Sequence, residues 1–370
     1  MKMLNIKRLN ALFIKESIQI IRDPSSILIA AILPLILLFL MGYAISLDSK
    51  NIPVGIVVEK SSKYTQSLVN TFSVSTSFNV KEVDTNRVQL NKYIKQGKIK
   101  AIIVIPSTFS KDIIKQNPKI QFITDGTEPS IAGYVYKYGY RLWQNWLIQE
   151  KLKLNPKIDI ESRYWFNAPL LSSYFLLPGS IAIILTLIGT LLTALVIARE
   201  WERGTMEAIM STPVTSAELI IGKVLPYFFL ALFSMVICVF ITLAWFQIPF
   251  RGSYFLLFIT SAIYLIPSLA LGLLISTLSK NQFVAAQVAL IVGFLPAMLL
   301  SGFIFQISSM PTWLQYVTII IPAKYFIPIL QTLFLSGNIY EVIIPNLIYM
   351  AILGILMFII IIKITRKKIE

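Results

Sequence analysis

The sequence contains no histidine and only one cysteine, Cys238. Without histidine, catalytic triads that use imidazole, histidine metal sites and imidazole pH switches are excluded. A single cysteine allows no disulfide within one chain and no thiolate zinc cluster. Cys238 lies in an unbroken apolar run, which favours a small buried side chain over a reactive one.

Charged residues are also scarce. They make up 14% of the chain, whereas 56% is hydrophobic, and soluble domains average ~25% charged residues. These values exclude a disordered chain and an ordinary cytosolic enzyme. The net charge of +15 would by itself suggest a nucleic-acid partner. So few charges on so apolar a chain instead predict a membrane protein that contacts lipids and no nucleic acid.

Six stretches are apolar enough to cross a bilayer, which requires ~20 residues of helix. They are residues 27–47, 174–198, 220–246, 254–278, 283–305 and 342–363. The segment 306–341 is less apolar and contains Pro311, Pro322 and Pro328. It is expected to form re-entrant or interfacial helices on the exit side. The pattern predicts an all-α membrane bundle of six helices.

The distribution of basic residues indicates the orientation of this bundle. Short cytoplasmic loops carry an excess of lysine and arginine, whereas long domains translocate regardless of charge. With the long segment after the first span set aside and the N-terminus inside, thirteen basic residues are cytoplasmic, against Arg251 and Lys324 outside. We expect both termini, including the tail 364–370, to be cytoplasmic and residues 48–170 to be extracytoplasmic.

The segment 48–170 alternates strand-like and helix-like runs. The strand candidates are 53–58, 78–83, 100–105 and 119–124, and the helix candidates are 63–72, 86–96, 106–115 and 129–152. This alternation predicts an inserted extracytoplasmic α/β domain. Asp125-Gly126-Thr127-Glu128 could bind a cation, but a turn followed by a helix cap is the simpler interpretation. Scattered lysines favour a solvated surface over a patch for an acidic partner.

Two segments on the cytoplasmic side are distinctive. Residues 1–26 form a basic amphipathic pattern typical of a helix in the membrane interface. It ends at Arg22-Asp23-Pro24, because Pro24 disfavours helix at Asp23. This helix is either a plain elbow or a support for a cytosolic partner.

The segment 199–219 carries six charges between Arg199 and Glu218. Thr212-Pro213 ends one helix, and Thr215 with Glu218 has the spacing of a capping box that begins the next. From these residues alone, the segment is either a connector or a docking site for a protein partner.

The same segment resembles a family signature. Ala198-Arg199-Glu200-x-Glu202-Arg203-Gly204-Thr205-x-Glu207, followed by Ser211-Thr212-Pro213-Val214, is similar to the signature of ABC-2 type exporter permeases. Further landmarks follow in the family's order: Arg22-Asp23-Pro24, Asn167-x-Pro169 and Ile321-Pro322-Ala323-Lys324-Tyr325-Phe326, with Ile321 where the family usually has asparagine. The resemblance is closest to the multidrug-type branch, which has a large domain after the first span.

The resemblance implies a six-helix fold of the type V exporter kind. It implies a dimer with a second copy or a homologous permease, and two separate ATPase subunits. The chain lacks a G-x-x-x-x-G-K-[ST] loop, so ATP and Mg²⁺ would bind to the partner ATPase. The chain itself is expected to bind no cofactor or metal and to be no enzyme.

The resemblance also implies roles for individual residues. The candidates for ATPase coupling are Arg199, Glu200, Glu202, Arg203, Gly204, Thr205, Glu207, Pro213 and Glu218. Arg22, Asp23 and Pro24 would fix the interfacial helix, and Pro322 and Tyr325 would shape an exit-side gate. For each charged candidate, pairing within the chain is the alternative.

No ionisable residue lies in the middle of a predicted span, which argues against an ion-coupled transporter. We expect export of amphiphilic, lipid-like or drug substrates from the cytoplasm or inner leaflet of a bacterial cytoplasmic (inner) membrane. A periplasmic adaptor is a further candidate partner. The alternative function is a membrane receptor or envelope assembly factor that uses the outer domain. A membrane enzyme would need a polar catalytic cluster, which the sequence does not offer.

Overall fold

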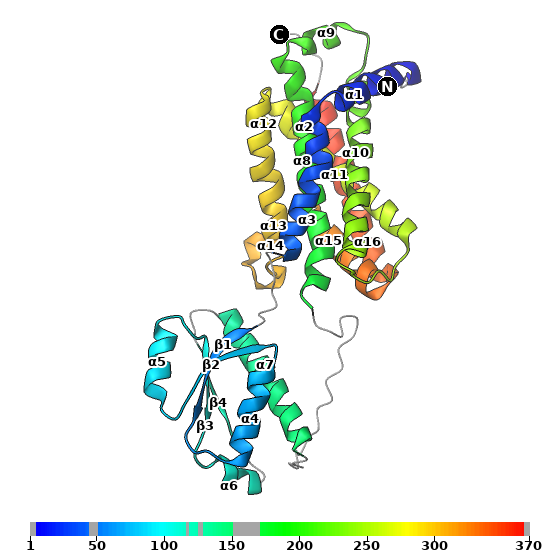
Figure 1. Ribbon diagram of the computed structural model, residues 1–370. Helices are drawn as coiled ribbons and strands as arrows, with labels where there is room; N and C mark the ends of the chain where they lie inside the picture. Colours follow the sequence, from blue (N-terminus) through cyan, green and yellow to red (C-terminus); the bar gives the residue numbers. More distant parts are fainter. Residues whose placement is uncertain (1–4, 44–50, 116–117, 125–128, 151–170, 366–370) are drawn as a thin grey trace. The chain divides into compact units, whose positions relative to one another are not determined.

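A computed structural model describes residues 5–43, 51–115, 118–124, 129–150 and 171–365 (Figure 1). The chain divides into two compact units, one of Met1–Ser46 with Tyr164–Glu370 and one of Leu47–Arg163. The first unit is helical, and the second contains a small sheet.

Six helical segments of the described residues are long and apolar enough to cross a membrane. They are α2–η1–α3 (Pro24–Ile27, Leu28–Ile32, Leu33–Tyr43), α8 (Ser173–Glu202), α10 (Ser216–Ala244), α11 (Tyr254–Ser279), α12–η2–α13 (Gln282–Val288, Ala289–Phe294, Leu295–Leu300) and α16 (Tyr340–Ile364). Each corresponds to one predicted span, and the prediction of a helical membrane bundle is confirmed.

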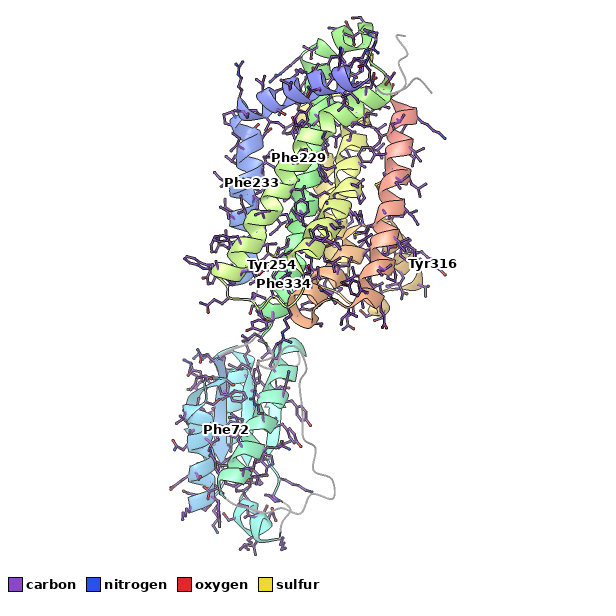
Figure 2. The ribbon with its side chains drawn as sticks, turned by 90° about the vertical axis from the view of Figure 1, so that its right-hand side faces the viewer. Phe72, Phe229, Phe233, Tyr254, Tyr316 and Phe334 are labelled. Atoms are coloured by element: carbon purple, nitrogen blue, oxygen red, sulfur yellow. The ribbon has the colours of Figure 1, made fainter. Side chains whose placement is uncertain are left out.

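Helix α8 is the core of this bundle, because nearly all of its apolar residues are buried. Its closest approach is to α11, where Gly272 faces Thr190 and a Cβ would overlap the Thr190 carbonyl oxygen. The hydroxyl of Thr193 also donates to the carbonyl of Leu269 on α11 over 2.8 Å. Aromatic residues such as Phe229 and Phe233 instead lie on the outer surface of α10 (Figure 2). This distribution suits a bundle whose outer surface faces lipid.

Pro34 shows how the first span keeps its backbone satisfied. Proline has no N–H, so the carbonyl of Ala30 loses its usual α-helical partner. The hydroxyl of Ser234 on α10 donates to that carbonyl over 2.5 Å. The bond replaces the missing donor and attaches the first span to α10.

The segment after the fifth span is bent. It contains η3 (Ile307–Ser309), α14 (Thr312–Val317), η4 (Thr318–Ile320), α15 (Ala323–Gln331) and η5 (Thr332–Ser336). Thr312–Ile320 and Ala323–Ser336 meet at 83°, where Pro322 interrupts the helix. The bend has the form expected of re-entrant helices, and the place of this segment in a bilayer stays a prediction.

The second unit has one sheet with strand order β2-β1-β3-β4. The strands are β1 (Ile52–Val58), β2 (Phe78–Asp84), β3 (Ala101–Ile105) and β4 (Gln121–Thr124), of which only β4 is antiparallel to its neighbour. Helix α5 (Arg87–Lys95) covers one face, and α4 (Lys63–Val74), α6 (Phe109–Ile114) and α7 (Pro129–Gln149) cover the other. Each of the four predicted strands and four predicted helices overlaps an observed one. Residues 151–152 of the last predicted helix lie outside the described residues. The predicted turn at Asp125–Glu128 lies outside the described residues.

Candidate functional site

Two short elements lie across one end of the bundle. Helix α1 (Ile6–Ile21) runs across the ends of the spanning helices, and α9 (Thr205–Ser211) lies at the same end (Figure 1). The last turn of α16 also reaches this end, where the hydroxyl of Ser216 donates to the carbonyl of Thr365 over 2.7 Å. The start and the end of the described chain therefore meet beside α9.

Local sequence explains how α9 forms. Gly204, between α8 and α9, has φ +68°, a left-handed conformation that side chains other than glycine disfavour. Pro213 then ends α9, because the residue before a proline is extended. Thr215 and Glu218 begin α10 with the predicted capping box: the Thr215 N–H donates to the Glu218 carboxylate over 2.8 Å, and the Glu218 N–H donates to the Thr215 hydroxyl over 3.2 Å.

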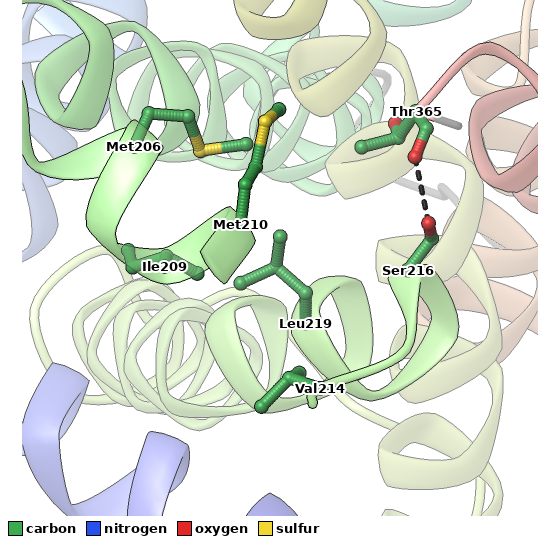
Figure 3. A pocket seen from close by; sticks show the side chains of 7 residues that line it. All are labelled: Met206, Ile209, Met210, Val214, Ser216, Leu219 and Thr365. Atoms are coloured by element: carbon green, nitrogen blue, oxygen red, sulfur yellow. Dashed lines mark hydrogen bonds between the residues drawn. The ribbon is translucent and has the colours of Figure 1, made fainter. Parts of the chain in front are cut away.

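Helix α9 has one apolar and one exposed face. Met206 is buried, Ile209 and Met210 are half-buried, and all three line a small cavity together with Leu219 (Figure 3). The cavity left between them measures only about 10 Å³. The opposite face is exposed and includes Glu207, together with Arg203 before the helix and Pro213 after it. The apolar face therefore anchors α9, and the exposed face is available to a partner.

Beneath α9 lies a buried charge cluster, defined by Lys15, Glu16, Glu200 and Lys223. The Lys223 ammonium donates to Glu16 over 2.5 Å and to Glu200 over 2.8 Å. Lys15 donates to Glu200 over 2.5 Å and lies 3.2 Å from Glu16. The two positive and two negative charges balance. Removing one partner of a buried pair typically costs ~3–5 kcal/mol, so the cluster holds α1, α8 and α10 in one arrangement.

Part of the cluster reaches solvent through Lys15. Partial burial opposes the charged form of this ammonium, but the Glu200 hydrogen bond and the charges of Glu16 and Glu200 raise its pKa. Lys15 therefore stays protonated at neutral pH.

Three further contacts tie α1, α8 and α10 together around the α9 segment. The hydroxyl of Thr205, the first residue of α9, donates to the carboxylate of Glu200. At the other side, Glu218 accepts from the backbone N–H of Asn5 over 2.7 Å. Arg8 of α1 donates to the carbonyl of Pro213 over 2.6 Å. Both ends of the α9 segment are thus attached to the helices beneath it.

Asp23 and Arg199 form a second charged contact. Their side chains lie 2.8 Å apart, and Arg199 is almost fully buried. Asp23 also caps α2 by accepting from the Ser25 N–H over 3.1 Å and from the Ser26 hydroxyl over 2.8 Å. Burial alone would raise the pKa of Asp23, but these donors and the Arg199 charge lower it to about 2. The carboxylate therefore attaches the start of the first span to the end of α8.

The remaining candidates occupy different places. Glu202 is exposed and accepts from Asn281 over 3.0 Å, which attaches α8 to the start of the fifth span. Arg22 is exposed, and Pro24 is the first residue of α2.

Pro322 and Tyr325 lie on the bent segment at the opposite end of the bundle. Tyr325 is buried, donates to the carbonyl of Ile319 over 2.9 Å and stacks on Tyr349.

Most of the coupling candidates lie at the same end of the bundle, but some are buried and others are exposed to solvent. Arg199, Glu200 and Glu218 are buried and bonded within the chain, as the alternative of internal pairing described. Glu16 and the internal roles of Lys15 and Lys223 were not predicted. A signal existed, because Glu16 interrupts an apolar stripe of α1 that includes Phe13 and Ile20, and Lys223 lies within an apolar run.

Comparison with known proteins agrees with this architecture. The model of the ABC-2 family transporter protein family matches residues 24–363. The chain is 45% identical to the probable multidrug ABC transporter permease YbhS of Escherichia coli K12, over 94% of this chain and 93% of that one. It is 30% identical to the probable multidrug ABC transporter permease YbhR of the same strain, over 89% and 90%. It is 25% identical to the inner membrane transport permease YhhJ, over 72% of each chain.

The matches cover the whole bundle as well as the second unit, and they confirm the resemblance seen in the motifs around Arg199–Glu207. Proteins of this kind are the membrane-spanning, non-enzymatic subunits of ABC transporters and work with separate ATPase subunits. The six apolar helices fit that role. The chain is a multi-pass membrane protein of the ABC-2 transporter permease family.

Proposed function

We propose that the chain is the permease subunit of an ABC exporter that moves amphiphilic, lipid-like or drug substrates out of the cytoplasm or the inner leaflet. It would act with a second copy of itself or a homologous permease. Separate ATPase subunits would bind ATP and Mg²⁺ and supply the energy. A periplasmic adaptor is a further partner in this proposal.

The observation that carries the proposal is the link from Thr205 through Glu200 to Lys223. It joins the first residue of an exposed helix to a buried cluster shared by three other helices. An exposed helix that only connected two spans would not need this attachment. A helix that a partner displaces would need it, because the attachment passes the displacement on to the bundle.

In this proposal the candidates have two roles. Arg203, Glu207 and Pro213, which are exposed, contact the ATPase, and Gly204 sets the direction of α9. Glu200 and Arg199 transmit the displacement to α1, α10 and the first span, because they are bonded to those elements. The expected result is a rigid-body rearrangement of the bundle.

The orientation follows from the same assignment. The end of the bundle with α1 and α9 is cytoplasmic, and both termini lie there. The second unit is extracytoplasmic, and the membrane is the bacterial inner membrane. The excess of basic residues in the segments around α1 and α9 supports this orientation.

Two observations support the substrate class: the names of the relatives and the polarity of the bundle interior. YbhS and YbhR are described as probable multidrug permeases. The spans bury hydroxyls such as Thr186 and Thr190. Their charged residues lie near the end with α1 and α9, except for Glu341 in the first turn of α16 at the other end. Such an interior suits amphiphiles better than ions. Pro322 and Tyr325, at the far end, would shape the exit-side gate.

Charge reversal tests the coupling. The chain is co-expressed with its ATPase and reconstituted in liposomes, with Arg203→Glu and Glu207→Arg as variants. Glu341→Arg, an exposed site at the opposite end, is the matched control. The two variants should lose ATPase co-purification or substrate-stimulated ATP hydrolysis, and the control should keep both. Unchanged coupling in the α9 variants would overturn the assignment.

Transport by the same liposomes tests the substrate class. We expect ATP-dependent movement of a fluorescent amphiphile, with none of a small inorganic ion. Transport of the ion alone would contradict the proposed substrate class. Ligand-dependent function without any nucleotide would instead favour the receptor alternative.

A further inference from the structure

The second unit contains a cavity that the exporter function does not use. It measures about 500 Å³ and lies where β1 and β2 end, against one side of α4. In open α/β sheets, ligands bind outside the carboxyl ends of the strands, at the point where the strand order reverses, which here lies between β1 and β3. Small-molecule sites commonly measure ~300–1,000 Å³. The cavity therefore has the size of a ligand site, and it lies at the carboxyl edge of the sheet, one strand pair away from that point.

The lining of this cavity selects against anions. Val58, Val69 and Val83 supply apolar contact, and the other lining residues are neutral polar side chains and the carboxylates of Glu59 and Asp84. No lysine or arginine lines it, although residues 48–169 contain eighteen basic and ten acidic residues. A negative cavity in a basic domain would attract a cation or a neutral polar molecule.

Both carboxylates are held in place before any ligand binds. Glu59 accepts from the Arg87 guanidinium over 3.0 Å and from the Ser107 N–H over 3.1 Å. One oxygen of Asp84 accepts from the N–H groups of Thr85 and Asn86 over 2.6 and 3.2 Å. Its other oxygen has no hydrogen-bond partner among the described residues. Because Arg87 balances Glu59, Asp84 carries the uncompensated negative charge.

The α4 side of the cavity adds uncharged hydrogen-bonding groups. Gln66, Asn70 and Ser73 lie along one side of that helix. The amide of Asn70 is exposed and makes no hydrogen bond within the described part of the chain. Groups of this kind bind hydroxyl or amide groups of a ligand.

A metal ion does not suit this cavity. Calcium takes six to eight oxygen ligands, several of them carboxylates, and no cluster of three or more acidic or thiol side chains suited to a metal occurs among the described residues. The volume is also far larger than a single ion needs. An organic cation fits both the one free carboxylate and the surrounding polar groups.

We propose that this cavity binds a hydroxylated organic ammonium compound. The ammonium group donates to the free oxygen of Asp84. The hydroxyl groups bond Asn70 and Ser73, and the carbon skeleton rests on Val69 and Val83. The site is separate from the ATPase contact, so it can be tested whether or not the exporter function holds.

The test is calorimetric titration of the full chain in lipid nanodiscs with three matched sugars. Glucosamine is cationic, N-acetylglucosamine is neutral and glucuronate is anionic. We expect saturable binding of glucosamine, at least about tenfold weaker binding of N-acetylglucosamine, since a hydrogen bond to a charged group is lost, and no binding of glucuronate.

Two variants locate the binding in the cavity. Asp84→Asn keeps the oxygen that bonds the backbone but removes the charge, and it should weaken glucosamine binding about tenfold or more. Asn70→Leu changes an exposed residue, so folding should be retained while the cavity is narrowed and binding is lost. Asp112→Asn on α6, which does not line the cavity, should bind as the wild type does. Preference for glucuronate, no saturation below about 10 mM, or binding unaffected by both variants would overturn the proposal.

Discussion

The ammonium of Lys223 on α10 donates a 2.5 Å hydrogen bond to the carboxylate of Glu16 on α1, 207 residues away in the chain. Both side chains are almost completely buried. This contact attaches a helix that lies across the end of the bundle to one that spans it. The stability of the arrangement and its coupling to α9 both depend on charges that stay paired.

Lys223→Met should destabilise the protein by about 3 kcal/mol, because Glu16 and Glu200 would then share only Lys15. The double variant Glu16→Gln/Lys223→Met should recover part of this loss, since the pair of Lys15 and Glu200 remains balanced. Thermal unfolding in detergent measures both effects. Lys7→Met, an exposed change on α1, is the control and should have little effect. A double variant no more stable than the single one would count against the charge balance.

Gly204→Ala should cost about 1 kcal/mol, because the residue has φ +68° and alanine disfavours that conformation. The space around it is open, so the effect comes from the backbone alone. ATPase coupling should fall more than stability does, because the direction of α9 changes. Gly133→Ala on α7, also in open space but inside a helix, should be neutral or stabilising. If both substitutions changed the stability equally, the left-handed backbone of Gly204 could not be the cause of the loss.

Asp23→Asn should show a pH-dependent loss of stability. The pKa of Asp23 in the folded protein is about 2, below its ordinary value of 3.8. A lowered pKa stabilises the fold above the ordinary value, and that stabilisation disappears as the pH falls toward 2. The wild type should therefore exceed the variant by about 1 kcal/mol at pH 6, since solvent partly screens the pair with Arg199.

Unfolding at pH values from 2 to 7 measures this difference between wild type and Asp23→Asn. It should shrink between about pH 4 and pH 2. A difference that does not change with pH would show that the Asp23 charge contributes nothing.

Ser234→Ala should cost about 1–2 kcal/mol, because the carbonyl of Ala30 would lose the donor that replaces the missing N–H of Pro34. In a Pro34→Ala background the same change should cost less, since the new N–H can bond that carbonyl. A double-mutant cycle followed by thermal unfolding gives the coupling energy. A cycle with no coupling would mean that the hydroxyl does not replace the missing donor.

Local patterns were sufficient to predict most elements of this fold. The six spans follow from uninterrupted apolar runs, and the alternating unit follows from the periods of its strands and helices. The capping box of Thr215 and Glu218 depends on residues three positions apart, so it could be recognised directly. Pro213 and Pro322 could also be recognised directly, because a proline ends or bends a helix through its own backbone.

The charge cluster could not be predicted in this way. Its members come from α1, α8 and α10, and only the crossing of α1 over the bundle brings Glu16 to Lys223. Lys15 and Lys223 are two of the thirteen basic residues that were counted as cytoplasmic. That count indicates orientation and says nothing about the partners of each residue. Glu200 was assigned to ATPase coupling from the family resemblance, with pairing within the chain as the alternative. Burial among helices distant in sequence gives it an internal role.

The central claim, that α9 is the contact with the ATPase, is tested most directly by site-specific crosslinking. The one native cysteine, Cys238, is completely buried, so Cys238→Ala gives a background for single cysteines. Glu207→Cys on α9 should form a crosslink to the co-expressed ATPase, and its yield should change when ATP binds. Glu341→Cys at the opposite end should form none. A crosslink at position 341 and none at position 207 would contradict the account.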